Sequence, residues 1–381
     1  MHYFDHAATT PMHPEVARAM LEVMQSPGGN ASSMHAFGRA ARQHINRSRD
    51  QIAAAIGCKP AELVFTSGGT ESNNMAIKGV VRALALQGKN HIITSEAEHH
   101  AVLHPCEALE REGFELTLLP VDEHGQVSPA DVAAAIKPNT ALISIMHGNN
   151  EVGSLQPIED IGRLAHEQGV IFHVDAVQAL GTAHYELNEL PVDLMSFSAH
   201  KINGPQGVGA LYIAAGTPFE ATTQGGSQER KRRAGTENVA GIVGFAKAVE
   251  ICVNEAQNKQ HFLGELRMEW IELLRKNVDI NIVINGAAKQ TLPHIVNISF
   301  IGIDTETMLM NLDMAGIAAA SGSACTSGAL ERSHVLRAMK LPEERLASAV
   351  RFSFGLGNTK EELGAAAQKV ATIVQRIRNN A

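Results

Sequence analysis

Short apolar runs alternate with amphipathic segments between residues 60 and 213, and this alternation constrains the fold more than any other feature of the sequence. Seven of the runs are strand-like: 63–66, 91–94, 115–119, 141–146, 170–174, 194–198 and 208–213. Helical patterns lie between most of them, for example 102–112, 129–136 and 158–168. Strands that alternate with helices form βαβ units, so we predict an α/β fold whose mostly parallel, seven-stranded sheet is covered on both faces.

The C-terminal part of the chain has a different pattern. A helical stretch at 238–277, with a break near 255–258, precedes more widely spaced elements. Strands are predicted at 280–284, 294–300, 317–319 and 350–354, and helices at 305–314, 333–339 and 360–377. Because 381 residues exceed what one simple core usually organises, we predict two domains. The large domain comprises 16–256, and a smaller α+β domain comprises 1–15 and 257–381.

Composition and charge exclude several classes of protein. Hydrophobic residues make up 44% and charged residues 19% of the chain, as in ordinary globular proteins. A net charge of −8 argues against general binding to nucleic acid or to membrane surfaces. No apolar run approaches the roughly 18 residues that span a bilayer, and the N-terminus lacks the pattern of a signal peptide. We therefore expect a cytoplasmic protein that binds neither membranes nor nucleic acid directly.

Polar residues follow two of the predicted strands, at the sheet edge where open parallel sheets bind ligands. Strand 63–66 leads into "TSGGTESNN", in which two glycines precede a helix that starts near Thr70. The free N–H groups of such a helix suit a phosphate, although glycine-rich turns are also common without any ligand. Strand 170–174 leads to Asp175, with Gln178 one turn later. This aspartate fits either a helix N-cap or the partner of a protonated ring nitrogen.

A third strand, 194–198, ends in Ser198, His200 and Lys201. A lysine beside a buried strand is costly unless it is paired or loses its charge. Together the three strand ends provide a phosphate site, a carboxylate and a reactive amine. These are the groups that hold pyridoxal 5'-phosphate as a Schiff base, so we predict this cofactor. His99 or His100, after strand 91–94, could stack on its ring.

The cysteines and histidines give no sign of a metal site. The four cysteines form no CxxC pair and are expected to be free thiols. Three lie in helical contexts that are typical of structural cysteines: Cys58, Cys106 and Cys252. His100 and His104 are spaced as metal ligands on a helix, but no third ligand lies near them in the sequence.

Cys325 has a different setting, because "AAASGSACTSGALERSHV" surrounds it with small and polar residues that predict an exposed loop. An exposed thiol in a cytosolic protein is a liability unless it is used. Arg351 lies inside the apolar strand "VRFSFG" and either holds a carboxylate or faces water at a sheet edge. The basic cluster Arg230–Arg233 is interpreted as a solvated loop, with docking of tRNA or of an acidic partner as the alternative.

Nine motifs occur along the chain in the order found in one enzyme family. They are "YFDHAATTP", "FTSGGTESNN", "EHHAVL", "GNNEVG", "HVDAVQALG", "SAHKINGPQGVG", "RRAGTEN", "SGSACTSG" and "RFSFG". On these motifs the chain resembles, over nearly its whole length, the NifS/IscS-type (group I) cysteine desulfurases. The resemblance implies the fold type I of pyridoxal-phosphate-dependent transferases. Ala31 and Arg332 stand where the family usually has proline, but neither position carries chemistry.

The resemblance also implies catalytic roles. Lys201 resembles the lysine that binds the cofactor covalently, and its burial would favour a neutral, reactive amine. Asp175 resembles the partner of the pyridine nitrogen, and Gln178 the contact to the ring hydroxyl. His99 resembles the stacking histidine that handles protons. Cys325 resembles the nucleophile that becomes a persulfide.

Further roles concern the phosphate, the substrate and a second subunit. The implied contacts to the cofactor phosphate are Gly69, Thr70, Ser198 and His200, with Thr236 supplied by the other subunit of a homodimer. Asn150 and Arg351 resemble the ligands of the substrate carboxylate. The mobile catalytic loop is expected at about 320–330, within the smaller domain.

The implied reaction takes sulfur from L-cysteine and yields L-alanine and a persulfide on Cys325. The implied acceptors are scaffold proteins of iron–sulfur cluster assembly or enzymes of tRNA thiolation. Selenocysteine lyase and other fold type I aminotransferase-like enzymes are the alternatives, although an aminotransferase has no use for Cys325. A catalytically silent sulfur-relay protein is a further alternative, against which Lys201, His99 and Cys325 argue.

Overall fold

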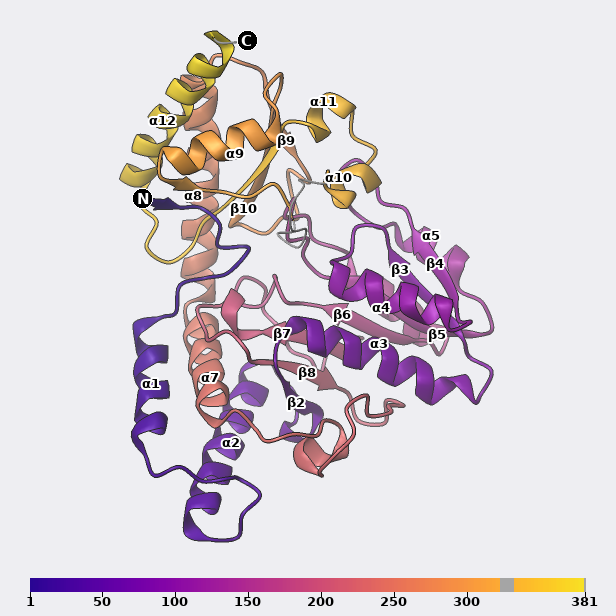
Figure 1. The fold of residues 1–381 in the computed structure, drawn as a ribbon. Coiled ribbons are helices and arrows are strands. Elements are labelled where there is room, and N and C mark those ends of the chain that lie inside the picture. Colours follow the sequence, from indigo (N-terminus) through magenta and orange to yellow (C-terminus); the bar gives the residue numbers. More distant parts are fainter. Residues whose placement is uncertain (323–331, 380–381) are drawn as a thin grey trace.

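The computed structural model of the chain describes residues 1–322 and 332–379. Its largest sheet has the strand order β2-β8-β7-β6-β5-β3-β4 (Figure 1). The strands are β2 (Leu63–Thr66), β3 (His91–Ser95), β4 (Glu115–Leu119), β5 (Thr140–Met146), β6 (Ile171–Asp175), β7 (Leu194–Ser198) and β8 (Gly209–Ile213). Neighbouring strands are parallel except at β8, which runs antiparallel to β2 and β7. The predicted seven-stranded, mostly parallel sheet is therefore confirmed.

The antiparallel direction of β8 follows from the short connection that precedes it. Only the 3-10 turn η2 (Ala199–Lys201) and a Gly/Pro turn separate β7 from β8. A parallel crossover needs a dozen or more residues, so the chain turns back on itself instead. This turn holds Lys201 just beyond the carboxyl end of β7.

Alternate residues of each strand pack on opposite faces of the large sheet. Ile92 and Leu142 belong to one core, whereas their neighbours Ile93 and Ile143 belong to another. This is the period of two that a strand buried on both faces requires. The first core includes residues of α3 (Gly69–Ala85) and α4 (His100–Arg111), and the second includes residues of α2 (Ala36–Ala55), α6 (Ile158–Glu167) and α7 (Val239–Asn254). Helices α1 (Pro14–Gln25) and α2 pack on α7, and α5 (Pro129–Ala135) packs on α6 and β4.

A separate core forms where the N-terminus meets the C-terminal part of the chain. Phe4 packs edge-on against Trp270 and Phe354, with ring centroids 5.3 Å apart in both pairs. The strands here are β1 (His2–Tyr3), β11 (Ile317–Ala318), β9 (Ile282–Asn285), β10 (Ile295–Phe300) and β12 (Ala349–Ser353), and the helices are α8 (Ala256–Asn277), α9 (Thr305–Met314) and α12 (Lys360–Asn379). The two short helices α10 (His334–Ala338) and α11 (Glu343–Leu346) instead pack against the core of the large sheet. β1 pairs with β11, and β10 pairs with both β9 and β12.

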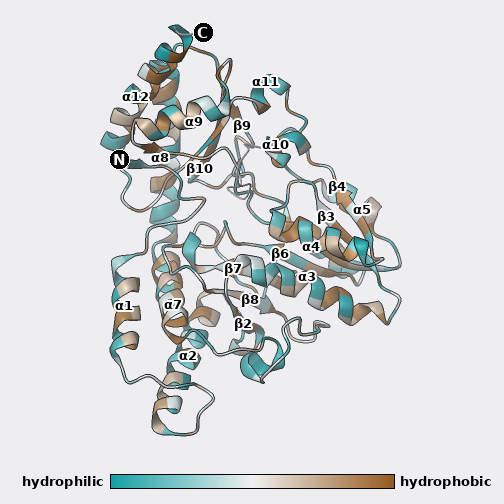
Figure 2. Cartoon of the chain, in the orientation of Figure 1, coloured by the Kyte–Doolittle hydropathy of each residue, from teal (hydrophilic) through white to brown (hydrophobic). Residues whose placement is uncertain are grey.

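Helices α7 and α8 form one column that runs along the length of the molecule (Figure 1). The column breaks at Glu255, within the break that the sequence indicated. The domain boundaries themselves stay a prediction. Figure 2 shows apolar and polar residues alternating along α12, which buries Leu363, Val370 and Val374 in the same core as Phe4. Among the described helices, none is long and apolar enough to cross a membrane.

Candidate active site

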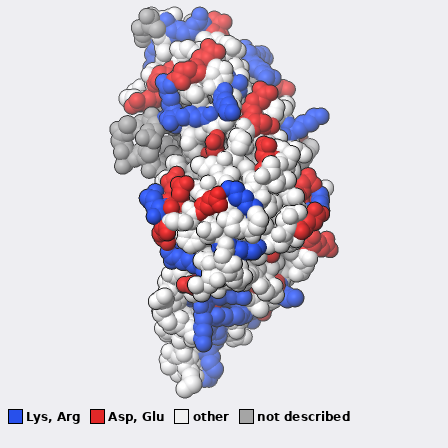
Figure 3. Space-filling view, turned by 90° about the vertical axis from the view of Figure 1, so that its right-hand side faces the viewer, with Lys and Arg blue, Asp and Glu red and all other residues white. Residues whose placement is uncertain are grey.

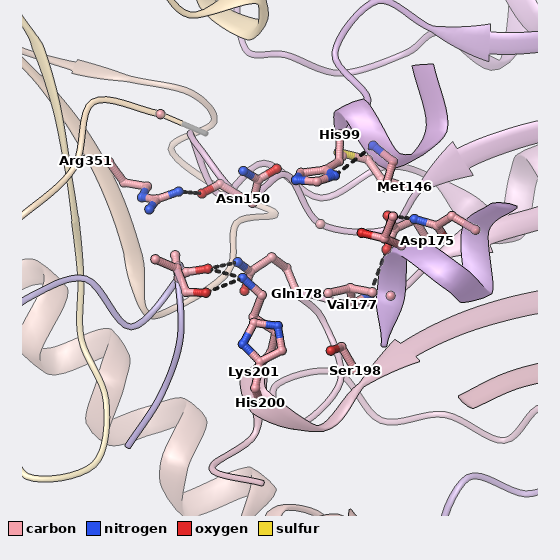
Figure 4. Close-up of a pocket in the computed structure, with 18 residues that line it drawn as sticks. His99, Met146, Asn150, Asp175, Val177, Gln178, Ser198, His200, Lys201 and Arg351 are labelled. Atoms are coloured by element: carbon pink, nitrogen blue, oxygen red, sulfur yellow. Dashed lines mark hydrogen bonds between the residues drawn. The ribbon is translucent and has the colours of Figure 1, made fainter. Parts of the chain in front are cut away.

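A cavity of about 230 Å³ lies where Met146, Asp175 and Ser198 end three adjacent strands of the large sheet (Figure 4). Residues of the N-terminal segment and of β12 close its opposite side. The cavity brings together all but two of the predicted site residues: Gly69, Thr70, His99, Asn150, Asp175, Gln178, Ser198, His200, Lys201 and Arg351. These residues come from distant parts of the sequence, so their convergence depends on the fold.

The start of α3 forms a cradle of the kind that binds phosphate. Gly68 is the N-cap residue of α3, and no side chain caps the helix. The first N–H groups of α3 therefore receive no hydrogen bond acceptor from a capping side chain. A Cβ atom on Gly69 would lie 2.6 Å from Val177 Cγ2, so only glycine fits there. Ser198 Oγ is buried and has no hydrogen-bond partner within the described part of the chain. The cradle thus offers both backbone and hydroxyl donors to an anion.

Asp175 is the last residue of β6 and is buried in the cavity wall. Asn73 Nδ2 donates a hydrogen bond of 2.7 Å to Asp175 Oδ2, and the Val177 N–H donates one of 2.9 Å to Oδ1. Burial raises the pKa of Asp175, whereas the two hydrogen bonds and the charge of Lys201 lower it. A carboxylate held in this way is suited to pair with a protonated ring nitrogen.

The N-terminal segment orients the amine of Lys201. Lys201 Nζ donates to the backbone carbonyls of Ala7, at 2.5 Å, and Ala8, at 2.9 Å. Gln178 Nε2 donates to the same Ala7 carbonyl at 2.7 Å, and Figure 4 shows both side chains directed at these oxygens. Lys201 is half-buried, and its amine lies within the cavity.

Two histidines of the cavity have pKa values well below the ordinary range. His99 is the N-cap of α4, and its Nδ1 accepts the Ala101 N–H at 3.0 Å, which leaves the proton of the neutral ring on Nε2. Burial, and then the charge of Lys201, lower the pKa of His99 to about 4. The same two causes lower the pKa of His200 to about 4. Both rings are therefore neutral at neutral pH.

Arg351 lies in β12 and is 2% exposed, so it does not face water as a sheet-edge residue would. Its Nη2 pairs with Asp5 Oδ1 at 2.7 Å, and its Nη1 donates to the backbone carbonyl of Asn150 at 2.9 Å. Its Nε is buried and has no hydrogen-bond partner among the residues described. The guanidinium therefore retains a donor for a ligand in the cavity, beside the Asn150 side chain.

Two predicted site residues do not line this cavity. Thr236 is exposed and lies outside the cavity of its own chain; its assignment to a second subunit stays a prediction. Cys325 lies outside the described residues. The other three cysteines are buried, and burial raises the pKa of Cys58 and Cys252 to about 12. Such thiols are poor nucleophiles at neutral pH.

The histidine pair that resembles a metal site in sequence forms a ring stack in the structure. His100 stacks on His104 at 4.7 Å and on His334 at 4.5 Å, measured between ring centroids. Across 1–322 and 332–379, no three His, Cys, Asp or Glu side chains gather as ligands for a metal ion.

The basic cluster Arg230–Arg233 is tied to the chain around it. Arg230 and Arg232 donate to the carbonyls of Pro60 and Ala61, and Arg233 forms a 2.7 Å ion pair with Glu71 at the start of α3. Figure 3 shows Lys and Arg gathered low on one face, at the height where Figure 1 places α2 and this cluster. Docking of tRNA or of an acidic partner at the cluster stays an untested alternative to a solvated loop.

Sequence reasoning did not find Asn73 or the carbonyls of Ala7 and Ala8. Asn73 follows Thr70 by three residues, so it lies on the same face of α3, and this spacing was the available signal. The two carbonyls belong to alanines with no functional side chain. Only the fold, which brings the N-terminal segment close to the end of β7, shows that these carbonyls accept the hydrogen bonds of Lys201.

The described residues fit pyridoxal 5'-phosphate by their own chemistry. The open start of α3 and the unpartnered Ser198 hydroxyl suit the phosphate. Asp175 suits the ring nitrogen, and Lys201 supplies an amine in the same cavity.

Comparisons with known proteins identify the family of the chain. A family model described as aminotransferase class-V matches residues 2–365. The cysteine desulfurase IscS of Dictyoglomus turgidum is 48% identical to this chain over 376 residues, covering 99% of the chain and 95% of the relative. The putative cysteine desulfurase IscS 1 of Bacillus subtilis is 47% identical, with 98% of the chain and 99% of the relative covered. A solved structure of a NifS-like protein is similar with a TM-score of 0.92 at 36% identity, covering 98% of this chain and 99% of that one.

Proposed function

The chain belongs to the aminotransferase class-V family, and we propose that it is a cysteine desulfurase that transfers sulfur from L-cysteine to its own Cys325. Its fold is the fold type I of pyridoxal-phosphate-dependent transferases, and its cofactor is pyridoxal 5'-phosphate. The observation that carries the proposal is the single cavity that gathers Lys201, Asp175, the cradle of α3 and Arg351.

The residues around the cavity divide the work of holding the cofactor. The α3 cradle, Ser198 and His200 bind the phosphate, with Thr236 contributed by a second subunit. Asp175 pairs with the ring nitrogen, Gln178 contacts the ring hydroxyl, and His99 stacks on the ring. When bound, the cofactor would supply an electron sink for the substrate Cα atom.

The substrate is oriented by its carboxylate. Arg351 and the Asn150 side chain bind this group, since both residues line the cavity and Arg351 Nε is not otherwise paired within the described residues. Lys201 Nζ then removes the proton from the substrate Cα, which its position beside Asp175 and Gln178 allows. The carbonyls of Ala7 and Ala8 guide the amine by accepting its hydrogen bonds.

Sulfur transfer joins two sulfur atoms and breaks one carbon–sulfur bond. The Cys325 thiolate attacks the sulfur of the bound cysteine, and the electron pair of the Cβ–S bond stays with Cβ. Cβ gains a proton and Cα regains the one that Lys201 removed, so the carbon fragment leaves as L-alanine. Cβ is thereby reduced by two electrons, while the two sulfur atoms of the persulfide together are oxidised by two. His99 moves the proton for this step. Its neutral ring carries the proton on Nε2, because Nδ1 accepts the Ala101 N–H.

The partners of this reaction follow from its product. A persulfide must pass to an acceptor, and the acceptors we propose are scaffold proteins of iron–sulfur cluster assembly or enzymes of tRNA thiolation. The protein acts as a homodimer in the cytoplasm, with Thr236 of each subunit completing the site of the other. The negative net charge of the chain supports acceptance by proteins rather than direct contact with nucleic acid.

One assay tests the function. Purified protein is examined for the visible absorption of the cofactor, then supplied with L-cysteine and a thiol reductant, and alanine and sulfide are measured together. We expect the two products in equal amounts. A cofactor band without alanine and sulfide would contradict the proposal, and turnover of L-selenocysteine alone would favour a selenocysteine lyase.

A further inference from the structure

The side chain of Glu151 meets both ends of the segment that contains Cys325. Glu151 belongs to the "GNNEVG" loop after β5 and is 1% exposed. Gly322, on one side of residues 323–331, lies against its carboxylate, and Ser333, on the other side, donates a hydrogen bond to Glu151 Oε2. No role in the proposed reaction has so far been given to this buried carboxylate.

The contact with Gly322 leaves no room for a side chain. A Cβ atom built on Gly322 would lie 2.8 Å from Glu151 Oε2 and 3.1 Å from its Cδ. Gly322 also lines the active-site cavity, so the chain here adjoins both the carboxylate and the site. A glycine at this position lets the chain approach the carboxylate closely.

The other end is fastened at two adjacent residues. Ser333 Oγ, besides its bond to Glu151, accepts the Leu336 N–H at 3.1 Å and so caps α10. The His334 ring stacks on His100 at 4.5 Å, and its Nε2 lies 2.8 Å from the Glu98 carbonyl oxygen. Helix α10 is thereby held against the start of α4, next to His99.

Glu151 is itself held by the loop that binds the substrate. Its N–H donates to Asn149 Oδ1 at 2.8 Å, and its carbonyl accepts Asn297 Nδ2 from β10 at 3.3 Å. The preceding residue is Asn150, whose carbonyl accepts Arg351 Nη1. One short loop therefore connects the predicted ligands of the substrate carboxylate to both ends of the cysteine-bearing segment.

Chain length explains why these ends matter for sulfur transfer. Cys325 follows Gly322 by three residues and precedes Ser333 by eight. Three extended residues span at most about 11 Å, so the position of Gly322 limits where the thiol can reach. The eight residues from Cys325 to Ser333 set a second limit on the position of the thiol.

We propose that Glu151 is a positioning residue for sulfur transfer, because its carboxylate fixes both ends of the segment carrying Cys325 next to the substrate-binding loop. The inference rests on the proposed function and assigns Glu151 no contact with substrate or cofactor. It acts through hydrogen bonding and shape, so an amide of the same size retains most of the effect.

The test compares Glu151→Ala and Glu151→Gln with the wild-type protein in a single turnover with L-cysteine. Persulfide formation is followed by the mass of the intact protein. We expect Glu151→Ala to slow persulfide formation about ten- to a hundred-fold, the effect of one hydrogen bond to a charged group. Glu151→Gln should recover most of the rate. The cofactor spectrum and its titration with L-cysteine should stay unchanged in both, because neither depends on Cys325.

The control is Glu62→Ala, which removes another buried carboxylate, one that accepts the Lys59 and Ala215 N–H groups away from the site. It should leave the rate of persulfide formation unchanged. An equal loss of rate in this control would overturn the inference, as would a Glu151→Ala variant as fast as wild type. If wild-type protein itself forms no persulfide, the proposed function fails, which is a different result.

A pair of substitutions tests the geometry and does not depend on the stability of one variant. Gly322→Ala should slow persulfide formation in the wild-type background, because its Cβ collides with the Glu151 carboxylate. In the Glu151→Ala background the same substitution should add little, because the collision is gone. Additive losses would show that Gly322 and Glu151 act separately and would overturn the inference.

Discussion

Replacing Asn73 with alanine should weaken cofactor binding without touching a residue that contacts the pyridine nitrogen. Asn73 Nδ2 is 2.7 Å from Asp175 Oδ2, and both side chains are buried. The hydrogen bond favours the ionised form of Asp175, whose pKa burial already raises. Without this bond, the Val177 N–H still donates a hydrogen bond to the carboxylate.

The magnitude follows from the kind of bond that is lost. A buried hydrogen bond to a charged group is worth about 1.5–3 kcal/mol, and losing it raises the pKa of Asp175 further. The affinity for pyridoxal 5'-phosphate should fall by about ten- to a hundred-fold, since only the ionised carboxylate pairs with the ring nitrogen. The deficit should grow as the pH is lowered, because the variant's Asp175 protonates first.

The assay is a titration of cofactor-free protein with pyridoxal 5'-phosphate, followed by visible absorption at several pH values. Asn74→Ala is the matched control. Asn74 is the next residue of α3, but its side chain donates to the Thr70 carbonyl and not to Asp175. A dissociation constant for Asn73→Ala within about two-fold of wild type would refute the reasoning, because the bond would then contribute almost nothing.

Four further outcomes are expected. Lys201→Ala should lose turnover by several orders of magnitude, and borohydride should no longer link the cofactor to the chain; retained linkage would refute its role. Cys325→Ala should keep the cofactor spectrum but form no persulfide and release no sulfide, and normal sulfide release would contradict its assignment. Arg351→Lys should raise KM for L-cysteine about ten-fold with a smaller change in kcat, because lysine has no Nε–H donor and cannot also replace the guanidinium contacts to Asp5 and the Asn150 carbonyl; an unchanged KM would exclude the contact of Arg351 with the substrate. Burial lowers the pKa of His173 to about 3. When the pH is lowered below about 6.5, the ring therefore binds a proton only in the unfolded state. This group alone should then lower the free energy of unfolding by about 1.4 kcal/mol for each pH unit of acidification. In His173→Gln, denaturant titrations at several pH values should show that the free energy of unfolding falls less steeply with decreasing pH, by that amount per pH unit. The same slope in the variant and the wild type would disprove this contribution of His173.

Much of the site could be predicted because its residues follow strands. Asp175 and Ser198 end buried parallel strands, and Lys201 follows directly, so the alternation of strands and helices already indicates that they meet at one edge of the sheet. Gly69 and Thr70 were recognisable because glycines before a helix have a known use in binding anions. These are local patterns whose positions in space follow from the fold class.

Other features depend on contacts that no local pattern encodes. Ala7 and Ala8 accept the hydrogen bonds of Lys201 through backbone oxygens, which any residue possesses. Asp5 pairs with Arg351 across 346 residues of sequence. Glu151 meets the ends of a distant segment because β5 and α10 contribute to the same hydrophobic core. Long-range pairing of this kind is determined by tertiary structure.

The central claim is that Cys325 receives the sulfur, and mapping the persulfide tests it most directly. Purified protein is treated with L-cysteine without reductant, persulfides are trapped with an alkylating agent, and the peptides are analysed by mass spectrometry. The account predicts an added sulfur atom on the peptide that carries Cys325 and none on those of Cys58, Cys106 or Cys252, which are buried. Sulfur on another cysteine, or alanine production without any persulfide, would contradict it.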